Sequence, residues 1–320
     1  MSLPESAPQA IGPAPIAAPA TLSIHDGRNG ALAALATYTL WGFLPLLFWQ
    51  VEAAGALMIV AERTVWSLLL LGVILLFRSG YGPVLALFRD RRRALGTLLS
   101  AVLLAGNWLL YVWAVETGQV LEVSFGYFIN PMVSVAMGMV LLGERQNRLQ
   151  TVAIVMALVA ILIQAIGLGN VPFIALGLAL SFGFYGYFRK TAQLGPASGL
   201  FVETAMLTPL ALGFMIYTFA TTGPGIHADP YYLTLLILTG PATAIPLLLF
   251  AFAVRRLRLT TMGMFQYLAP SIQFLLAIYV FGEQLNGLRL VSFALIWLSL
   301  MVFSYDSFTR RKRSVVAPVA

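Results

Sequence analysis

The chain has 320 residues, of which 60% are hydrophobic and 10% are charged, and its mean hydropathy is +0.88. A soluble protein carries roughly 25% charged residues, so this chain lacks the polar surface that a water-facing globule needs. Its net charge is +7, but the basic residues are spread over short loops rather than gathered in one patch, which argues against a nucleic-acid-binding protein.

The predicted elements are helices that cross a membrane. Residues 1–30 are rich in Pro and Ala without the basic start of a signal peptide, so we expect a disordered cytoplasmic tail there. Apolar runs long enough to cross about 30 Å of hydrocarbon then recur along the chain. We predict ten spans: 31–50, 56–77, 95–115, 122–142, 149–168, 172–188, 198–219, 231–252, 261–281 and 288–305. A basic cytoplasmic tail, 306–320, follows, and the predicted fold class is an all-α integral membrane protein.

Lys and Arg alternate between the predicted loops. They follow spans two, four, six, eight and ten, as in Arg91–Arg93 and Arg310–Arg313, whereas the loops between contain almost none. Cytoplasmic loops of membrane proteins carry this excess of basic residues. The pattern predicts that both termini and the even-numbered loops lie in the cytoplasm.

Two parts of the chain resemble each other at an offset of 139 residues. GYFINPMVSVAMGMVLLGE (126–144) lies over FQYLAPSIQFLLAIYVFGE (265–283), which places Pro131 over Pro270 and Glu144 over Glu283. We therefore predict repeat 1 over 31–168 (spans 1–5) and repeat 2 over 172–305 (spans 6–10). Because five spans are an odd number, the second repeat would be inverted in the membrane, an arrangement typical of alternating-access transporters.

The paired prolines raise a structural question, because proline removes a backbone donor that hydrocarbon cannot replace. Such a residue is tolerated where its helix lines a cavity or packs on protein. We predict that Pro131 and Pro270 bend spans four and nine around a central cavity. The alternative is a pair of packing kinks without a ligand.

Charged and polar side chains inside the spans are the candidate site residues. Arg63 either binds solute or pairs with a carboxylate of another helix, since Glu62 points about 100° away from it. Glu62 and Glu203 are either symmetry-related gates or a proton relay, or they are structural. Amides and aromatic rings would form the walls of the cavity. The full set of binding or gating candidates is Trp41, Glu62, Arg63, Asn107, Tyr111, Tyr127, Asn130, Pro131, Tyr185, Glu203, Gln266, Tyr267 and Pro270.

Other chemistry has little support in the sequence. Cysteine is absent, and the two histidines, His25 and His227, lie far apart, so we expect no metal site. No P-loop, HExxH motif or Ser-His-Asp candidate is present, so we expect no cofactor, no ATP motor and no catalytic residue. Two alternatives to a carrier stay open: a membrane enzyme acting on a lipid or polyprenyl substrate, and a non-transporting membrane sensor.

An ordered set of stretches resembles the EamA-type drug/metabolite transporter superfamily, and within it the RarD-like branch. The stretches cover nearly the whole chain except both tails: YTLWGFLPLLFW (38–49), AERTVWSLLLL (61–71), NWLLYVWAV (107–115), GQVLEVSFGYFINP (118–131), LLGER (141–145), FGFYGYFRK (182–190), LFVETAMLTPLAL (200–212), TGPATAIPLLLFAFAVRRLRL (239–259) and QYLAPSIQFLLA (266–277).

The resemblance implies a ten-helix carrier of the bacterial inner membrane that moves small organic molecules outward. Its partners would be the solute and the lipid bilayer, driven either by protons as coupling ion or by the solute's own gradient. Related sequences often have a histidine before the span-two arginine, where this chain has Glu62, so a role tied to that imidazole does not carry over.

Overall fold

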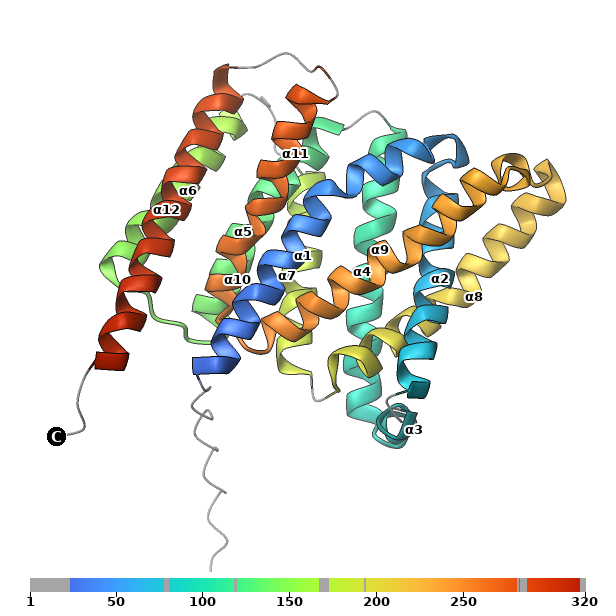
Figure 1. The fold of residues 1–320 in the computed structure, drawn as a ribbon, viewed down its shortest axis with the longest axis horizontal. Coiled ribbons are helices and arrows are strands. Elements are labelled where there is room, and N and C mark those ends of the chain that lie inside the picture. The colour runs from blue at the N-terminus through green and yellow to red at the C-terminus, as the bar shows by residue number, and fades with distance from the viewer. Residues whose placement is uncertain are drawn as a thin grey trace, which may run out of the picture.

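The computed structural model describes residues 24–77, 81–117, 120–166, 173–192, 194–280, 282 and 287–316. All regular elements in this part of the chain are helices (Figure 1). In chain order they are α1 (Ile24–Gln50), η1 (Glu52–Ala54), α2 (Ala56–Phe77), α3 (Tyr81–Arg89), α4 (Arg91–Glu116), α5 (Val120–Leu141), α6 (Arg148–Ile166), α7 (Phe173–Thr191), α8 (Pro196–Thr222), η2 (Gly225–Ala228), α9 (Pro230–Val254), α10 (Leu259–Gln266), α11 (Leu268–Tyr279) and α12 (Gly287–Val316).

Each predicted span overlaps a helix, but some bounds differ. Helix α1 begins at Ile24 and α12 continues to Val316, so both extend into the predicted tails. The predicted span 261–281 is divided at Tyr267 into α10 and α11. Pro270 is the third residue of α11, where a helix start leaves N–H groups without partners in any case. Pro131 lies inside the continuous helix α5.

Helix α3 was not predicted, because its nine residues are too short and too mixed to read as a span. It buries Val84 and Leu87 against Leu75 of α2 and Val202 of α8. The hydroxyl of Tyr81 donates a hydrogen bond to the carbonyl of Gly72 at 3.0 Å. These contacts hold the short helix beside the bundle at the lower edge of Figure 1.

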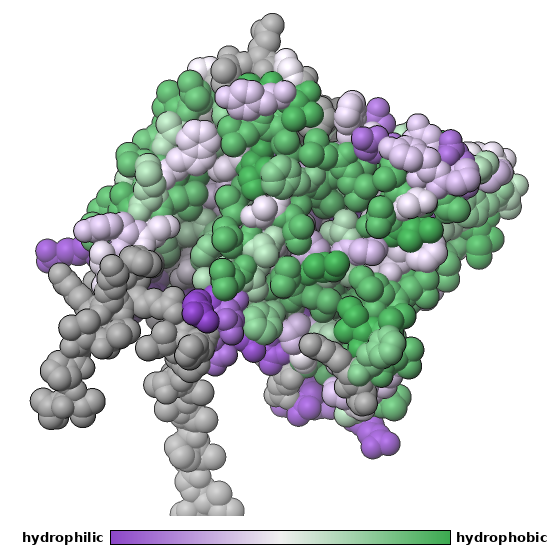
Figure 2. Space-filling view, viewed as in Figure 1, coloured by the Kyte–Doolittle hydropathy of each residue, from purple (hydrophilic) through white to green (hydrophobic). Residues whose placement is uncertain are grey.

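The surface of the bundle is that of a membrane protein. A hydrophobic band covers most of the face shown in Figure 2, and hydrophilic residues gather toward its lower edge and upper right. Among the described residues, α1, α2, α4, α8 and α9 contain apolar stretches long enough to cross a membrane, and α5, α6 and α12 contain shorter ones. Leu76, Val140 and Leu210 are more than 60% exposed, as side chains that face lipid would be.

Small residues allow the helices to approach closely. A Cβ on Gly240 of α9 would collide with Trp66 and Ser67 of α2, and the Ser67 hydroxyl donates to the Gly240 carbonyl at 3.0 Å. A Cβ on Gly263 of α10 would lie 2.5 Å from the carbonyl oxygen of Pro131 in α5. Close contacts of this kind fix how α9 and α10 sit against α2 and α5.

The described ends of the chain lie on one side of the bundle. In Figure 1 the N-terminal end of α1, the C-terminal ends of α7 and α9, and the C-terminal end of α12 all lie toward the lower edge. The basic clusters Arg91–Arg93 and Arg255–Arg258 belong to helix ends on this side. We call this side the arginine-rich end.

Candidate functional site

A cavity of about 230 Å³ lies between the helices of the bundle. Its residues on α1 and α4 belong to the halves of those helices that are farther from the arginine-rich end. The walls are mainly aromatic and aliphatic, with a few amides and one guanidinium, which is the usual composition of a small-molecule site. The lining residues are Tyr38, Trp41, Leu44, Pro45, Phe48, Arg63, Leu104, Asn107, Trp108, Tyr111, Gly126, Tyr127, Asn130, Leu178, Phe182, Leu247, Gln266, Ala269, Pro270 and Gln273.

Arg63 reaches the cavity from α2. Its Nε donates a hydrogen bond to the Thr243 hydroxyl oxygen of α9 at 2.9 Å. Its guanidinium carbon lies 4.5 Å from the ring centroid of Trp108 and 5.4 Å from that of Phe48. Cation–π contacts of this kind contribute about 0.5–2 kcal/mol each. The sequence analysis left open that Arg63 pairs with a carboxylate. Among the described residues, no carboxylate forms an ion pair with Arg63.

Two amide side chains of the cavity wall, Asn107 and Gln266, form hydrogen bonds between helices, and a third, Asn130, has a buried oxygen. The Asn107 amide nitrogen donates to the Leu178 carbonyl and the Ser181 hydroxyl of α7, each at 2.9 Å. Gln266 accepts a hydrogen bond from the Ser134 hydroxyl at 3.0 Å. Asn130 is 8% exposed, and its Oδ1 has no partner among the described residues. A buried polar atom without a partner is uncommon in folded proteins.

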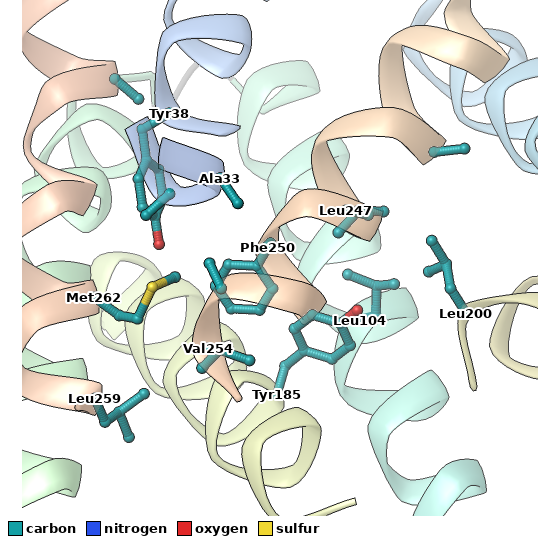
Figure 3. Packing of buried hydrophobic residues seen from close by; sticks show 14 of the residues in the cluster. Ala33, Tyr38, Leu104, Tyr185, Leu200, Leu247, Phe250, Val254, Leu259 and Met262 are labelled. Carbon is teal, nitrogen blue, oxygen red and sulfur yellow. The ribbon is translucent and has the colours of Figure 1, made fainter. Parts of the chain in front are cut away.

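Buried apolar side chains close the cavity on the side of the arginine-rich end. Figure 3 shows Tyr38, Leu247, Phe250, Tyr185 and Met262 packed together from α1, α9, α7 and α10. The rings of Tyr185 and Phe250 stack with centroids 5.9 Å apart and an angle of 13° between them. We call this group the aromatic plug. Tyr38 and Leu247 belong both to the plug and to the cavity wall.

Glu62 does not line the cavity, although Arg63 beside it does. Its carboxylate is buried and accepts a hydrogen bond from the Trp66 indole nitrogen at 2.7 Å. Its other oxygen lies 2.8 Å from Nε2 of His227, which belongs to η2. Consecutive helical residues point in different directions, so the helix turns Glu62 toward the loop and Arg63 toward the solute space.

Glu203 lies in a separate network toward the arginine-rich end. It is fully buried, forms an ion pair with Arg189 at 3.4 Å and accepts hydrogen bonds from the hydroxyls of Ser100 and Tyr185. A second cavity of about 320 Å³ lies here, lined by Arg92, Arg93, Ser100, Arg189, Glu203 and their neighbours. The predicted candidates thus fall into a central set and two separate carboxylate networks.

Three other predicted residues are near the cavity without lining it. Tyr267 is completely buried between α10 and α11, and its hydroxyl has no partner among the described residues. Tyr185 belongs to the aromatic plug, and Pro131 lies against Gly263. The remaining candidates line the cavity: Trp41, Arg63, Asn107, Tyr111, Tyr127, Asn130, Gln266 and Pro270.

The sequence analysis did not predict several of the residues that line the cavity. Tyr38, Pro45 and Phe48 lie at helical spacing from Trp41, and Leu104 and Trp108 lie at helical spacing from Asn107 and Tyr111. This periodicity of one helix face was the available signal. Thr243, the partner of Arg63, carried no such signal, because it belongs to a helix distant in sequence.

The carboxylate of Glu144 is a structural contact. It accepts hydrogen bonds from the backbone nitrogens of Leu259 and Thr260 at 2.6 and 2.9 Å, at the start of α10. A carboxylate is stabilising at this positive end of a helix. Its predicted repeat mate, Glu283, lies outside the described residues.

An all-helical bundle with a lipid-type surface is typical of multi-pass membrane proteins. The comparisons with known proteins narrow this class. The model of the EamA-like transporter family matches residues 28–165. An uncharacterized transporter of Vibrio cholerae is 39% identical over 283 residues, which cover 88% of this chain and 94% of that protein. Protein RarD of Escherichia coli is 38% identical over 90% of this chain and 98% of its own.

The chain belongs to the EamA-like transporter family and is a RarD-like member of it, as the resemblance in its sequence implied. It is therefore a multi-pass protein of a bacterial inner membrane, in a family of membrane transporters. The chloramphenicol-sensitive protein RarD of Pseudomonas aeruginosa is 29% identical over 87% of this chain. A solved crystal structure with 16% identity shares the fold, with a TM-score of 0.68 over 87% of this chain and 98% of that chain.

Proposed function

We propose that the protein is a secondary carrier that moves a small organic solute across the inner membrane by alternating access. The observation that carries this proposal is the cavity, which is lined by both halves of the chain and closed on one side by the aromatic plug. The plug belongs to helices of both halves, so a movement of one half against the other would open it. The same movement would close the opposite side.

The architecture that we propose is ten spans in two inverted repeats, 31–168 and 172–305. The packing of the helices supports it. If α1, α2, α4, α5 and α6 correspond to α7, α8, α9, α10–α11 and α12, the contacts of α5 with α7 correspond to those of α11 with α1. The contacts of α2 with α9 likewise correspond to those of α4 with α8. The family model also ends near the end of the first proposed repeat.

In this carrier the binding candidates are the cavity-lining set, and both termini are cytoplasmic. Glu62 and Glu203 would act outside the binding site, as anchors on either side of it. The enzyme alternative would need clustered catalytic groups at one interface. The carboxylates of Glu62, Glu144 and Glu203 lie instead in separate networks, each with its own hydrogen-bond donors.

Flux through reconstituted liposomes tests the proposal. Wild type should move at least one class of small organic solute faster than protein-free liposomes do. Asn130→Leu, which removes the unpartnered amide from the cavity, should slow that flux at least about tenfold. Tyr217→Phe is the control, because Tyr217 is 68% exposed and does not line the cavity. If no solute in a broad panel moves faster than through protein-free liposomes, the transport proposal fails.

A further inference from the structure

The cavity contains a cation whose charge is not neutralised by an acid in the described part of the chain. Arg63 has one hydrogen-bond partner among the described residues, the hydroxyl oxygen of Thr243. That hydroxyl donates its own proton to the Thr239 carbonyl at 2.7 Å, so its oxygen accepts from Nε of Arg63. The two terminal nitrogens of the guanidinium are therefore left to the cavity.

The surroundings of Arg63 fix the direction in which these nitrogens can bind. The guanidinium carbon lies 4.5 Å from the ring centroid of Trp108 and 5.4 Å from that of Phe48. These rings contact the guanidinium but do not accept hydrogen bonds from its N–H groups. Thr243 holds the Nε side. An arginine held in this way presents its two terminal N–H groups as a fork, which matches the two oxygens of a carboxylate.

Building on the proposed carrier function, we propose that the solute is a small organic carboxylate with a flat apolar body, and that Arg63 binds its carboxylate. The cavity volume of about 230 Å³ fits a small molecule. The rings of Trp41, Tyr111 and Tyr127 provide flat apolar walls for the body. The amide of Asn130 adds a polar group to the same cavity wall.

This solute class has a consequence for the driving force. The interior of the cell is electrically negative relative to the outside. The membrane potential therefore favours the outward movement of an anion. A potential of 100 mV shifts the equilibrium distribution of a monovalent anion by about 50-fold. Export of a carboxylate would then need no coupled ion, and the flux would carry charge.

Binding of matched probes tests the carboxylate site. The protein in lipid nanodiscs is titrated with benzoate and with its neutral isostere benzamide, and tryptophan fluorescence is followed, because Trp41 and Trp108 line the cavity. Wild type should bind benzoate at least about tenfold more tightly than benzamide. Arg63→Gln should remove this preference, and Arg63→Lys, which keeps the positive charge, should retain part of it.

Arg148→Gln is the matched control, since Arg148 is exposed at the start of α6 and should leave the preference unchanged. Thermal unfolding of each variant shows that it is folded. Equal binding of the two probes to wild type, no binding of either, or a preference that survives Arg63→Gln would overturn the proposal.

Flux separates this inference from the carrier proposal. A protein that transports neutral solutes but neither binds nor transports carboxylates is a carrier without the anion site. A protein that binds benzoate through Arg63 and moves no solute has the site without being a carrier. If benzoate flux is carried as the anion, a potassium diffusion potential set with valinomycin should change its rate, whereas a potential-independent rate would contradict transport of the anion alone.

Discussion

At the scale of single residues, the Arg189–Glu203 pair is the most buried ion pair of the described chain. Glu203 is fully buried and Arg189 is 2% exposed. Taking two charges out of water costs free energy that their attraction only partly offsets. The pair is held by the added hydrogen bonds from Ser100, Tyr185 and the contact of Arg189 with the Pro196 carbonyl at 3.0 Å.

Glu203→Ala should therefore lower the free energy of unfolding by about 3–5 kcal/mol, because it leaves the Arg189 charge buried without its partner. The double change Arg189→Met with Glu203→Leu should cost less than the single change. Denaturant unfolding in detergent measures both. Arg93→Ala is the control, since its ion pair with Asp90 is exposed and such pairs contribute about 0–1 kcal/mol. A Glu203→Ala protein as stable as wild type would contradict this account.

Some of the site residues could be predicted from the sequence, and others could not. The repeat pattern and the polarity inside the spans pointed to Arg63, Asn107 and Asn130, and all three line the cavity. The same reasoning grouped Glu62 with them. It could not foresee that His227, 165 residues away in the chain, would meet the Glu62 carboxylate at 2.8 Å. Pairings set by tertiary structure carry no local signal.

At the scale of helices, the crossing of α5 and α10 combines a proline and a glycine. Pro131 lies inside α5, and Gly263 allows α10 to pack directly on its carbonyl oxygen. Pro270, the other proline of the predicted pair, lies in the first turn of α11, just after the helix break at Tyr267. The two prolines therefore occupy different local structures, although they align in sequence.

Gly263→Ala should destabilise the protein by about 1–3 kcal/mol, because the added methyl would lie 2.5 Å from the Pro131 carbonyl oxygen and force α10 away from α5. Gly106→Ala in α4 is the matched control. A Cβ there meets nothing within 4 Å, and alanine favours the helix. Thermal unfolding should rank Gly263→Ala below wild type and Gly106→Ala at or above it. The reverse order would mean that the close contact is unimportant.

The helices themselves could be predicted well, because apolar length is a strong signal in a chain with few charges. The predicted 56–77 coincides with α2 (Ala56–Phe77). The break at Tyr267 could not be predicted. Pro270 shows that a backbone N–H is missing near this point, but it does not show at which residue the helix is interrupted. Helix α3 could not be predicted either, because its stability comes from packing against α2 and α8 rather than from its own length.

At the scale of the whole molecule, the described ends of the chain and the arginine-rich loops share one side of the bundle (Figure 1). The proposal of two inverted five-span repeats requires both termini on the same side of the membrane, and the basic loops predict that this side is the cytoplasm. Reporter fusions at Arg28 and after Arg313 should both report the cytoplasm, and a fusion in the loop 221–229 should report the outside. Termini reported on opposite sides of the membrane would contradict the inverted-repeat architecture.

The central claim is that the cavity between the two halves opens to each side of the membrane in turn. The most direct test is the labelling of single cysteines by a membrane-impermeant thiol reagent added from either side, which suits a chain without native cysteine. Cysteines replacing Asn130 and Gln266 in the cavity should react from both sides, and transported solute should protect them. Cysteines replacing the buried Tyr267 and the lipid-facing Leu210 should stay unreactive. If the cavity positions react from one side only, or no more than position 210, alternating access through this cavity is contradicted.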